Sequence, residues 1–313
     1  MIKNISVIGA GTMGHGIANA FARYGYKISM YDRNKKNHEN VMDEIKSELE
    51  FMAEEKYIDK ELINSTLSNI KIFSNLEETV KDSDYVIETI SEDVKSKQEL
   101  FNQLDKICPN HTILSSNTSS LSLSKLIENI SVERKKRVMI CHWYNPAHLM
   151  PIIELSYFGN MSEDIFSDVY ALYISIEKQP IKVKKDIPGM IANRLLHALA
   201  REAFHLIETE AVSPEDIEKA LKYGPGFRSA TTGILESADL GGLDIWCTVE
   251  DNLFKELNNS DRVCDLMKQK VKEGCLGLKT EEGFFKYPKD GKEKTRKDFF
   301  RRLIVQLKAS KNY

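Results

Sequence analysis

Hydrophobic and polar positions in the first half of the chain alternate between short apolar runs and amphipathic stretches. An apolar strand at residues 5–9 leads into a helix that extends to about residue 24. Further strands are predicted at residues 27–31, 70–73, 85–90 and 112–115, with helices at residues 76–81 and 95–107. This β-α repetition is typical of an α/β, Rossmann-type doubly wound parallel sheet. The charged segment 35–69 interrupts it, and we predict a helical hairpin that turns near residues 56–59.

Two more apolar strands, at residues 137–141 and 152–155, enclose a loop that contains two prolines and an asparagine. A helix at residues 163–176 and a last strand at residues 179–184 follow. We therefore predict a first domain of residues 1–185.

From Asp186 onward the pattern is that of helices only. Pro188-Gly189 breaks the chain before an apolar-striped helix at residues 190–209, and Ser213-Pro-Glu-Asp predicts an N-cap for a helix to residue 222. Later helices are predicted at residues 240–257 and 262–273, and a basic amphipathic helix at residues 292–311. Residues 186–313 are thus predicted to be an all-helical domain for substrate binding and dimerisation.

Composition adds limits to this picture. The chain of 313 residues suits about two domains, and 42% hydrophobic with 29% charged residues is ordinary for a soluble protein. The net charge of -3 gives no reason to expect nucleic acid or a membrane surface as a partner. No signal peptide or membrane span is predicted, and the five cysteines lack CxxC spacing. We expect a cytoplasmic protein with reduced thiols and no metal site.

Glycines follow the first predicted strand directly. Gly9, Gly11 and Gly14, in Gly-Ala-Gly-Thr12-Met13-Gly, open the first helix, and Asp32 ends the second strand. Such glycines let the backbone approach a pyrophosphate, while the carboxylate binds the ribose hydroxyls. The arrangement predicts a dinucleotide site for NAD, because the acid would repel the 2′-phosphate of NADP. The neighbouring Arg33 leaves NADP as the alternative.

The loop between residues 141 and 152 carries the candidate chemistry. His142 lies at a strand end and Glu154 on the returning strand, so the loop can bring the two side chains together. A carboxylate that holds one ring nitrogen leaves the other ready to act as a base near neutral pH. The polar cluster at residues 115–120 follows another strand, and it is either a turn with a helix cap or a ligand contact.

These motifs resemble those of the short-chain L-3-hydroxyacyl-CoA dehydrogenase family, which includes bacterial 3-hydroxybutyryl-CoA dehydrogenases. The resemblance covers nearly the whole chain and includes Ser116-Asn-Thr-Ser-Ser-Leu, His142-x-x-Asn145-Pro and Pro188-Gly-Met-Ile-Ala-Asn193-Arg-Leu. It implies reversible NAD-dependent oxidation of a 3-hydroxyl to a 3-keto group, with His142 as base and Glu154 as its orienting partner. Ser119 and Asn193 would contact the reacting oxygen. The positions implied for the rest of the cofactor are Glu92, Lys97, Ser119, Asn145 and Lys279.

Two departures from the family pattern leave the substrate open. Glu48 and Glu55 stand where the family's hairpin contacts CoA, and carboxylates repel the phosphates of CoA. The segment 224–236 with Arg228, and the tail after Tyr287, resemble relatives that oxidise free hydroxy acids such as L-gulonate or carnitine. The segment 238–244 is closer to the acyl-CoA enzymes, which remain our first expectation.

A third possibility is a catalytically silent NAD-binding or structural protein, since lambda-crystallin shows that this fold can take a structural role. The base, its partner and both oxygen contacts are present, and this favours an enzyme.

Overall fold

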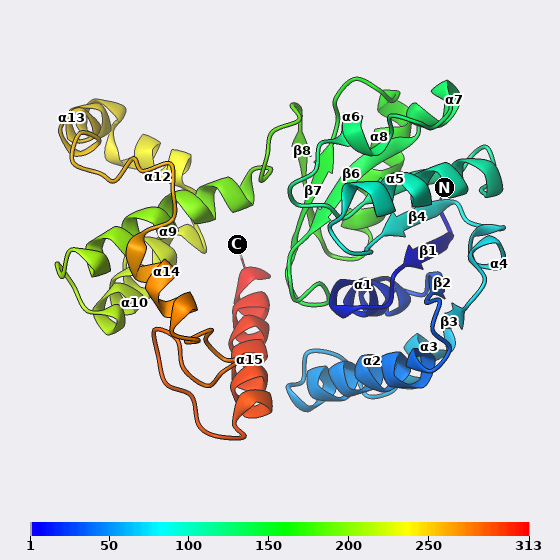
Figure 1. The fold of residues 1–313 in the computed structure, drawn as a ribbon, viewed down its shortest axis with the longest axis horizontal. Helices are drawn as coiled ribbons and strands as arrows, with labels where there is room; N and C mark the ends of the chain where they lie inside the picture. The colour runs from blue at the N-terminus through cyan, green and yellow to red at the C-terminus, as the bar shows by residue number, and fades with distance from the viewer. Residues whose placement is uncertain (1, 313) are drawn as a thin grey trace. The chain divides into compact units, whose positions relative to one another are not determined.

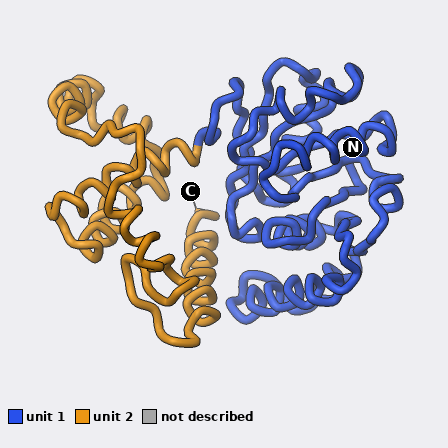
Figure 2. Tube along the Cα trace, viewed as in Figure 1, with its two compact units in different colours: residues 1–191 blue, residues 192–313 orange. Residues whose placement is uncertain are grey.

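The computed structural model describes residues 2–312. By its internal contacts the chain divides into two compact units, residues 1–191 and residues 192–313 (Figure 2). The first unit has the predicted Rossmann-type α/β fold and the second is helical (Figure 1). Among the described residues, no helix is both long and apolar enough to cross a membrane.

An eight-stranded sheet forms the centre of the first unit, in the order β3-β2-β1-β4-β5-β6-β7-β8. Its strands are β1 (Asn4–Ile8), β2 (Lys27–Tyr31), β3 (Ile70–Phe73), β4 (Tyr85–Glu88), β5 (Ile113–Ser116), β6 (Val138–Trp143), β7 (Ile152–Ser156) and β8 (Gln179–Val183). All neighbouring strands are parallel except β6 and β7, which are antiparallel. Because parallel strands end at the same edge, the loops after β1, β2, β4 and β5 gather there.

Helices cover both faces of this sheet, as doubly wound folds require. The bounds are α1 (Thr12–Ala22), α2 (Asn37–Glu54), α3 (Leu62–Ser68), α4 (Leu76–Val80), α5 (Val94–Ile107), α6 (Leu123–Leu126), α7 (Val132–Lys135) and α8 (Glu163–Ile174). One buried cluster joins α1, α2 and α8 to the sheet, for instance through Phe21, Ile45 and Val169. A second cluster contains Phe101 of α5 and Leu126 of α6. The predicted hairpin is present as α2 and α3.

The described residues of the second unit form helices, apart from isolated antiparallel bridges that join Gly277 to Glu282 and Glu282 to Lys286. The helices are α9 (Ala192–Glu208), α10 (Pro214–Tyr223), α11 (Pro225–Ser229), α12 (Ile234–Gly241), α13 (Leu243–Leu253), α14 (Asp265–Lys272) and α15 (Lys292–Ser310). The predicted cap of α10 is present, since Ser213 accepts a hydrogen bond from the Asp216 amide at 3.1 Å. The single helix predicted at residues 240–257 was wrong, because Gly242 has a φ of 92° and separates α12 from α13.

The division between the units falls after Ile191, whereas the sequence placed it after residue 185. Residues between these points still pack on the sheet. Met190 is buried in the same cluster as Val183 of β8, and the Ile191 amide donates to the Glu154 carboxylate at 2.8 Å. These contacts hold the segment to the first unit even though its pattern has left the β-α repeat.

Candidate active site

The glycine loop joins β1 to α1, and it is crowded at Gly9 and Gly14 but open at Gly11. Gly9 has a φ of 106°, and its amide donates to the Tyr31 carbonyl at 3.0 Å. A Cβ on Gly14 would lie 1.8 Å from the Gly9 carbonyl oxygen, so only glycine fits there. A Cβ on Gly11 would meet nothing within 4 Å, which leaves the start of α1, at Thr12 and Met13, open to a phosphate.

Asp32 follows β2 beside this loop. Its carboxylate accepts hydrogen bonds from the Asn34 amide at 2.8 Å and from the Asn37 side chain at 3.3 Å. The side chain is half-buried, while Arg33 is exposed. A fixed carboxylate next to the glycines fits the adenosine ribose of NAD.

His142 and Glu154 face each other directly across the antiparallel strands β6 and β7. His142 Nδ1 lies 2.6 Å from Glu154 Oε2, and Glu154, with 0% exposure, also accepts the Ile191 amide through Oε1. Nε2 of His142 makes no hydrogen bond to any of residues 2–312. The sequence placed His142 at a strand end and relied on the loop for the pairing. The structure instead continues β6 through Trp143, so the sheet register sets the pair.

Cys141, next to this pair, is a buried thiol within β6. Its Sγ lies 2.7 Å from the Tyr173 hydroxyl, and burial raises the pKa of Cys141 to about 12. A thiol with such a pKa is a poor nucleophile at neutral pH. Cys141 is therefore a packed strand residue and not a candidate nucleophile.

The serine loop, residues 116–120, leaves the end of β5 and is held by hydrogen bonds to Glu92 and to β6. Glu92 Oε1 accepts hydrogen bonds from the Ser119 amide at 3.1 Å and from the Ser120 amide at 3.2 Å. Asn117 accepts the Trp143 amide at 2.8 Å, which fixes the loop beside the His142 strand. The sequence did not single out Asn117. A polar residue inside a serine-rich turn carries no separate signal.

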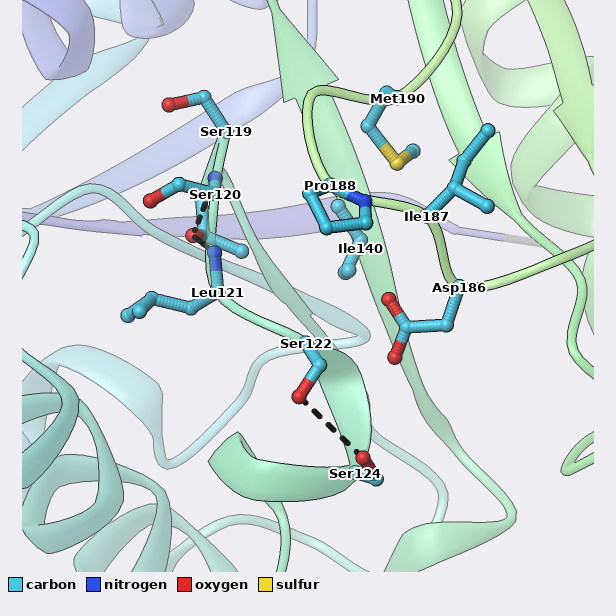
Figure 3. A pocket seen from close by; sticks show the side chains of 11 residues that line it. Ser119, Ser120, Leu121, Ser122, Ser124, Ile140, Asp186, Ile187, Pro188 and Met190 are labelled. Atoms are coloured by element: carbon cyan, nitrogen blue, oxygen red, sulfur yellow. Dashed lines mark hydrogen bonds between the residues drawn. The ribbon is translucent and has the colours of Figure 1, made fainter. Parts of the chain in front are cut away.

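A cavity of about 360 Å³ lies between the serine loop and residues 186–190 (Figure 3). Ser119 lines it, and Ile140 of β6 lies between the two walls. Asp186 joins the walls by accepting the Leu123 amide at 3.0 Å. His142 is not among the lining residues, so the cavity shares Ser119 with the candidate site but does not contain the histidine.

Two predicted cofactor residues, Glu92 and Lys97, form an ion pair near the carboxyl end of β4. Lys97 Nζ lies 3.3 Å from Glu92 Oε2 and 2.6 Å from Glu88 Oε1. Burial opposes ionisation of Glu92, but hydrogen bonds from Thr118 and the charge of Lys97 lower its pKa. Sequence reasoning missed Glu88, although an acid at the end of an apolar strand was a visible signal.

The remaining predicted residues lie elsewhere. Asn145 is exposed in the loop after β6. Asn193 is on α9, Arg228 on α11 and Lys279 between α14 and α15, all in the second unit. Their roles stay predictions.

The sequence placed Glu48 where its carboxylate would repel the phosphates of CoA, but in the structure this side chain turns inward. The side chain is mostly buried, and it accepts hydrogen bonds from Asn19 at 2.9 Å and pairs with His15 at 3.0 Å. Its carboxylate is therefore held by side chains of α1, and Glu48 no longer supports the argument against CoA. Among residues 2–312, no group of three or more His, Cys, Asp or Glu residues could hold a metal ion.

Comparison with known proteins identifies the family. Residues 4–187 match the 3-hydroxyacyl-CoA dehydrogenase NAD binding domain, and residues 189–287 match the 3-hydroxyacyl-CoA dehydrogenase C-terminal domain. The chain belongs to the 3-hydroxyacyl-CoA dehydrogenase family. It is an NAD-dependent oxidoreductase of that type, which confirms the resemblance, the enzyme class and the cofactor inferred from the sequence.

Two relatives within this family are named for different substrates. The chain is 31% identical to 5-formyl-3-hydroxy-2-methylpyridine 4-carboxylate 5-dehydrogenase of Mesorhizobium japonicum, over 97% of each chain. It is 36% identical to the probable 3-hydroxybutyryl-CoA dehydrogenase of Bacillus subtilis, over 91% of this chain and 98% of that one.

Similar solved structures likewise include both a pyridine carboxylate enzyme and an acyl-CoA enzyme. A crystal structure of 5-formyl-3-hydroxy-2-methylpyridine 4-carboxylic acid 5-dehydrogenase, described as an NAD+ dependent dismutase, has a TM-score of 0.90, 30% identity and 99% coverage of both chains. The (S)-3-hydroxybutyryl-CoA dehydrogenase of Ralstonia eutropha has a TM-score of 0.75 and 31% identity, over 92% of this chain and 100% of that one.

Proposed function

We propose that this family member interconverts an alcohol and a carbonyl compound, with NAD as hydride carrier and His142 as the base. The observation that carries the proposal is the His142–Glu154 pair at 2.6 Å, in which His142 lies on β6, the strand that pairs with β5. NAD at the glycine loop supplies the hydride acceptor for oxidation and, as NADH, the hydride donor for reduction.

The chain's own residues then move the proton. Glu154 holds the Nδ1 proton of His142, so the lone pair on Nε2 is free to take the proton of the substrate hydroxyl. The buried carboxylate stabilises the imidazolium that results. Ser119 and Asn193 donate hydrogen bonds to the oxygen as it becomes a carbonyl. In the reverse direction the imidazolium returns the proton.

Replacing His142 by Gln tests this role. Loss of a general base costs about 10²- to 10⁴-fold in rate, so we expect turnover to fall by that range while NADH affinity stays within twofold. Turnover is followed by nicotinamide absorbance, and NADH affinity by fluorescence titration. Wild-type turnover in the variant would refute the assignment of His142 as base. NADH binding by the wild type without turnover of any substrate would support the silent NAD-binding alternative.

For the substrate we propose a small hydroxy or oxo compound that carries a free carboxylate, with Arg228 as the partner of that carboxylate. The match to the pyridine carboxylate enzyme supports this, because it extends over 99% of both chains and so takes in the tail beyond the family's C-terminal domain. Arg228 is exposed on α11, so its guanidinium is open to an anionic ligand.

A second candidate substrate is an L-3-hydroxyacyl-CoA such as 3-hydroxybutyryl-CoA. The family models and the Bacillus subtilis relative favour it, and the internal pairing of Glu48 removes one of the two carboxylates that spoke against CoA. A panel of acetoacetyl-CoA, carnitine, gulonate and aromatic aldehyde carboxylates separates the two. We expect turnover of a free carboxylate with KM raised about tenfold or more in Arg228→Gln, since a charge-assisted hydrogen bond is lost. Turnover of acetoacetyl-CoA alone, unaffected by that substitution, would establish the second candidate.

We also propose that the protein is a cytoplasmic homodimer. Apolar side chains of the second unit, each more than half exposed, support self-association; they include Leu195, Phe227, Leu235, Leu240 and Phe254. The five cysteines are all free thiols, which suits a reducing compartment.

A further inference from the structure

Glu88 is a fully buried carboxylate at the end of β4, with 0% exposure. Its two oxygens accept from three groups. Oε1 accepts from Lys97 Nζ at 2.6 Å and from the Ile90 amide at 2.7 Å, while Oε2 accepts from the Ser116 hydroxyl at 2.5 Å. Burial raises the pKa of Glu88, and the ion pair with Lys97 opposes that shift. A buried carboxylate with three donors is fixed in position.

Lys97 joins this carboxylate to Glu92. Its side chain is only 1% exposed, and Nζ lies 3.3 Å from Glu92 Oε2. The other oxygen of Glu92 takes the amides of Ser119 and Ser120 and the hydroxyl of Ser120. A chain of contacts therefore runs from Glu88 through Lys97 and Glu92 to the C-terminal part of the serine loop.

Glu88 also holds the beginning of the same loop. The Ser116 hydroxyl that donates to Glu88 accepts the Thr118 amide at 3.3 Å, and the Glu88 carbonyl accepts the Asn117 amide at 2.9 Å. One residue thus fixes both ends of the loop that presents Ser119.

We propose that Glu88 is a positioning residue of the NAD site, which sets Glu92 and the serine loop in the geometry that binds the cofactor. This proposal rests on the proposed function for NAD binding, and the roles of Glu92 and Ser119 at the cofactor are those that the family resemblance implies. In this arrangement Lys97 connects Glu88 to Glu92.

Removing the charge of Glu88 would change the position of Glu92. The buried ammonium of Lys97 would keep a single carboxylate partner, Glu92, and would draw it inward. Glu92 would then leave the amides of Ser119 and Ser120, and the loop would lose its anchor. A cation that loses a buried partner is strongly destabilising, so the local structure must shift in response.

Glu88→Gln is the test, because glutamine keeps the shape and loses the charge. Asp105→Asn is the matched control. Asp105 also lies on α5, near the opposite end from Lys97, and pairs with the buried Arg134 at 3.3 Å. We expect the Kd for NADH, measured by fluorescence, to rise about tenfold or more in Glu88→Gln and to stay within twofold in Asp105→Asn. Both variants should lose thermal stability.

An NADH affinity of Glu88→Gln within twofold of the wild type would overturn the proposal, as would an equal loss of affinity in Asp105→Asn. If Glu88→Gln fails to fold, Glu88→Gln with Lys97→Met removes both charges and leaves neither unpaired. We expect this double variant to fold and still bind NADH about tenfold more weakly; wild-type affinity would overturn the proposal. NADH titration needs no substrate, so failure of the His142 mechanism would leave this result unaffected.

Discussion

Lys178 carries its ammonium into the interior of the first unit, where it is 4% exposed. Nζ donates to the Ala147 carbonyl at 2.8 Å and to the Met150 carbonyl at 2.6 Å, and it lies 5.1 Å from the centre of the Trp143 ring. These contacts hold the loop after β6. Burial, together with the charge of Arg23, lowers the pKa of Lys178 to about 7.

This depressed pKa predicts a stability that rises with pH. Below about pH 7 the folded and unfolded chains both hold the proton, whereas between pH 7 and about pH 10.4 only the unfolded chain holds it. Relative to Lys178→Met, the free energy of unfolding of the wild type should gain up to about 1.4 kcal/mol per pH unit above pH 7. Urea unfolding of both proteins at pH 6, 7, 8 and 9 measures this. A constant difference across that range would contradict the prediction.

At the same scale, the sequence identified most candidate residues but not the partners that they contact in the fold. Gly9, Gly14, Asp32, His142 and Glu154 could be selected because residue type and order carry their signal. Asn117 could not, since its importance comes from a partner 26 residues away. The acid at the end of an apolar run marked Glu88, but nothing in the run showed its partner 28 residues away.

At the scale of elements, α1 and α2 show how a local pattern becomes a tertiary contact. His15 and Asn19 on α1, and Glu44 and Glu48 on α2, are each four residues apart, so each pair lies on one helix face. Burial opposes protonation of His15, but the carboxylates of Glu48 and Glu44 raise its pKa. The hairpin is therefore fastened to α1 by polar pairs as well as by the apolar cluster.

In the strand pair β6 and β7, by contrast, the local pattern does not determine the contact. Apolar runs predicted both strands, yet the position of His142 depends on a register of antiparallel pairing that no run of residues specifies. If the register of β6 and β7 shifted by one residue, His142 and Glu154 would no longer lie opposite each other. Only the assembled sheet decides that they meet.

At the scale of the whole molecule, the exposed apolar residues of the second unit predict self-association. The wild type should elute with about twice the chain mass of 35.8 kDa in light scattering, and Leu235→Glu should shift it toward the monomer. Val132→Glu, at an exposed apolar position of the first unit, is the control and should not change the mass. A monomeric wild type would refute the dimer.

The sequence by itself determined the Rossmann-type fold, the NAD fingerprint, the helical second half and the identity of the histidine and its carboxylate. These depend on periodicity and on residue order over short distances, which a chain displays before it folds. Tertiary structure alone decided that Glu48 turns inward, that Lys97 is shared between Glu88 and Glu92, and that sheet register aligns His142 with Glu154. Each of these joins residues from separate elements, and their energies arise only when burial removes water from both partners.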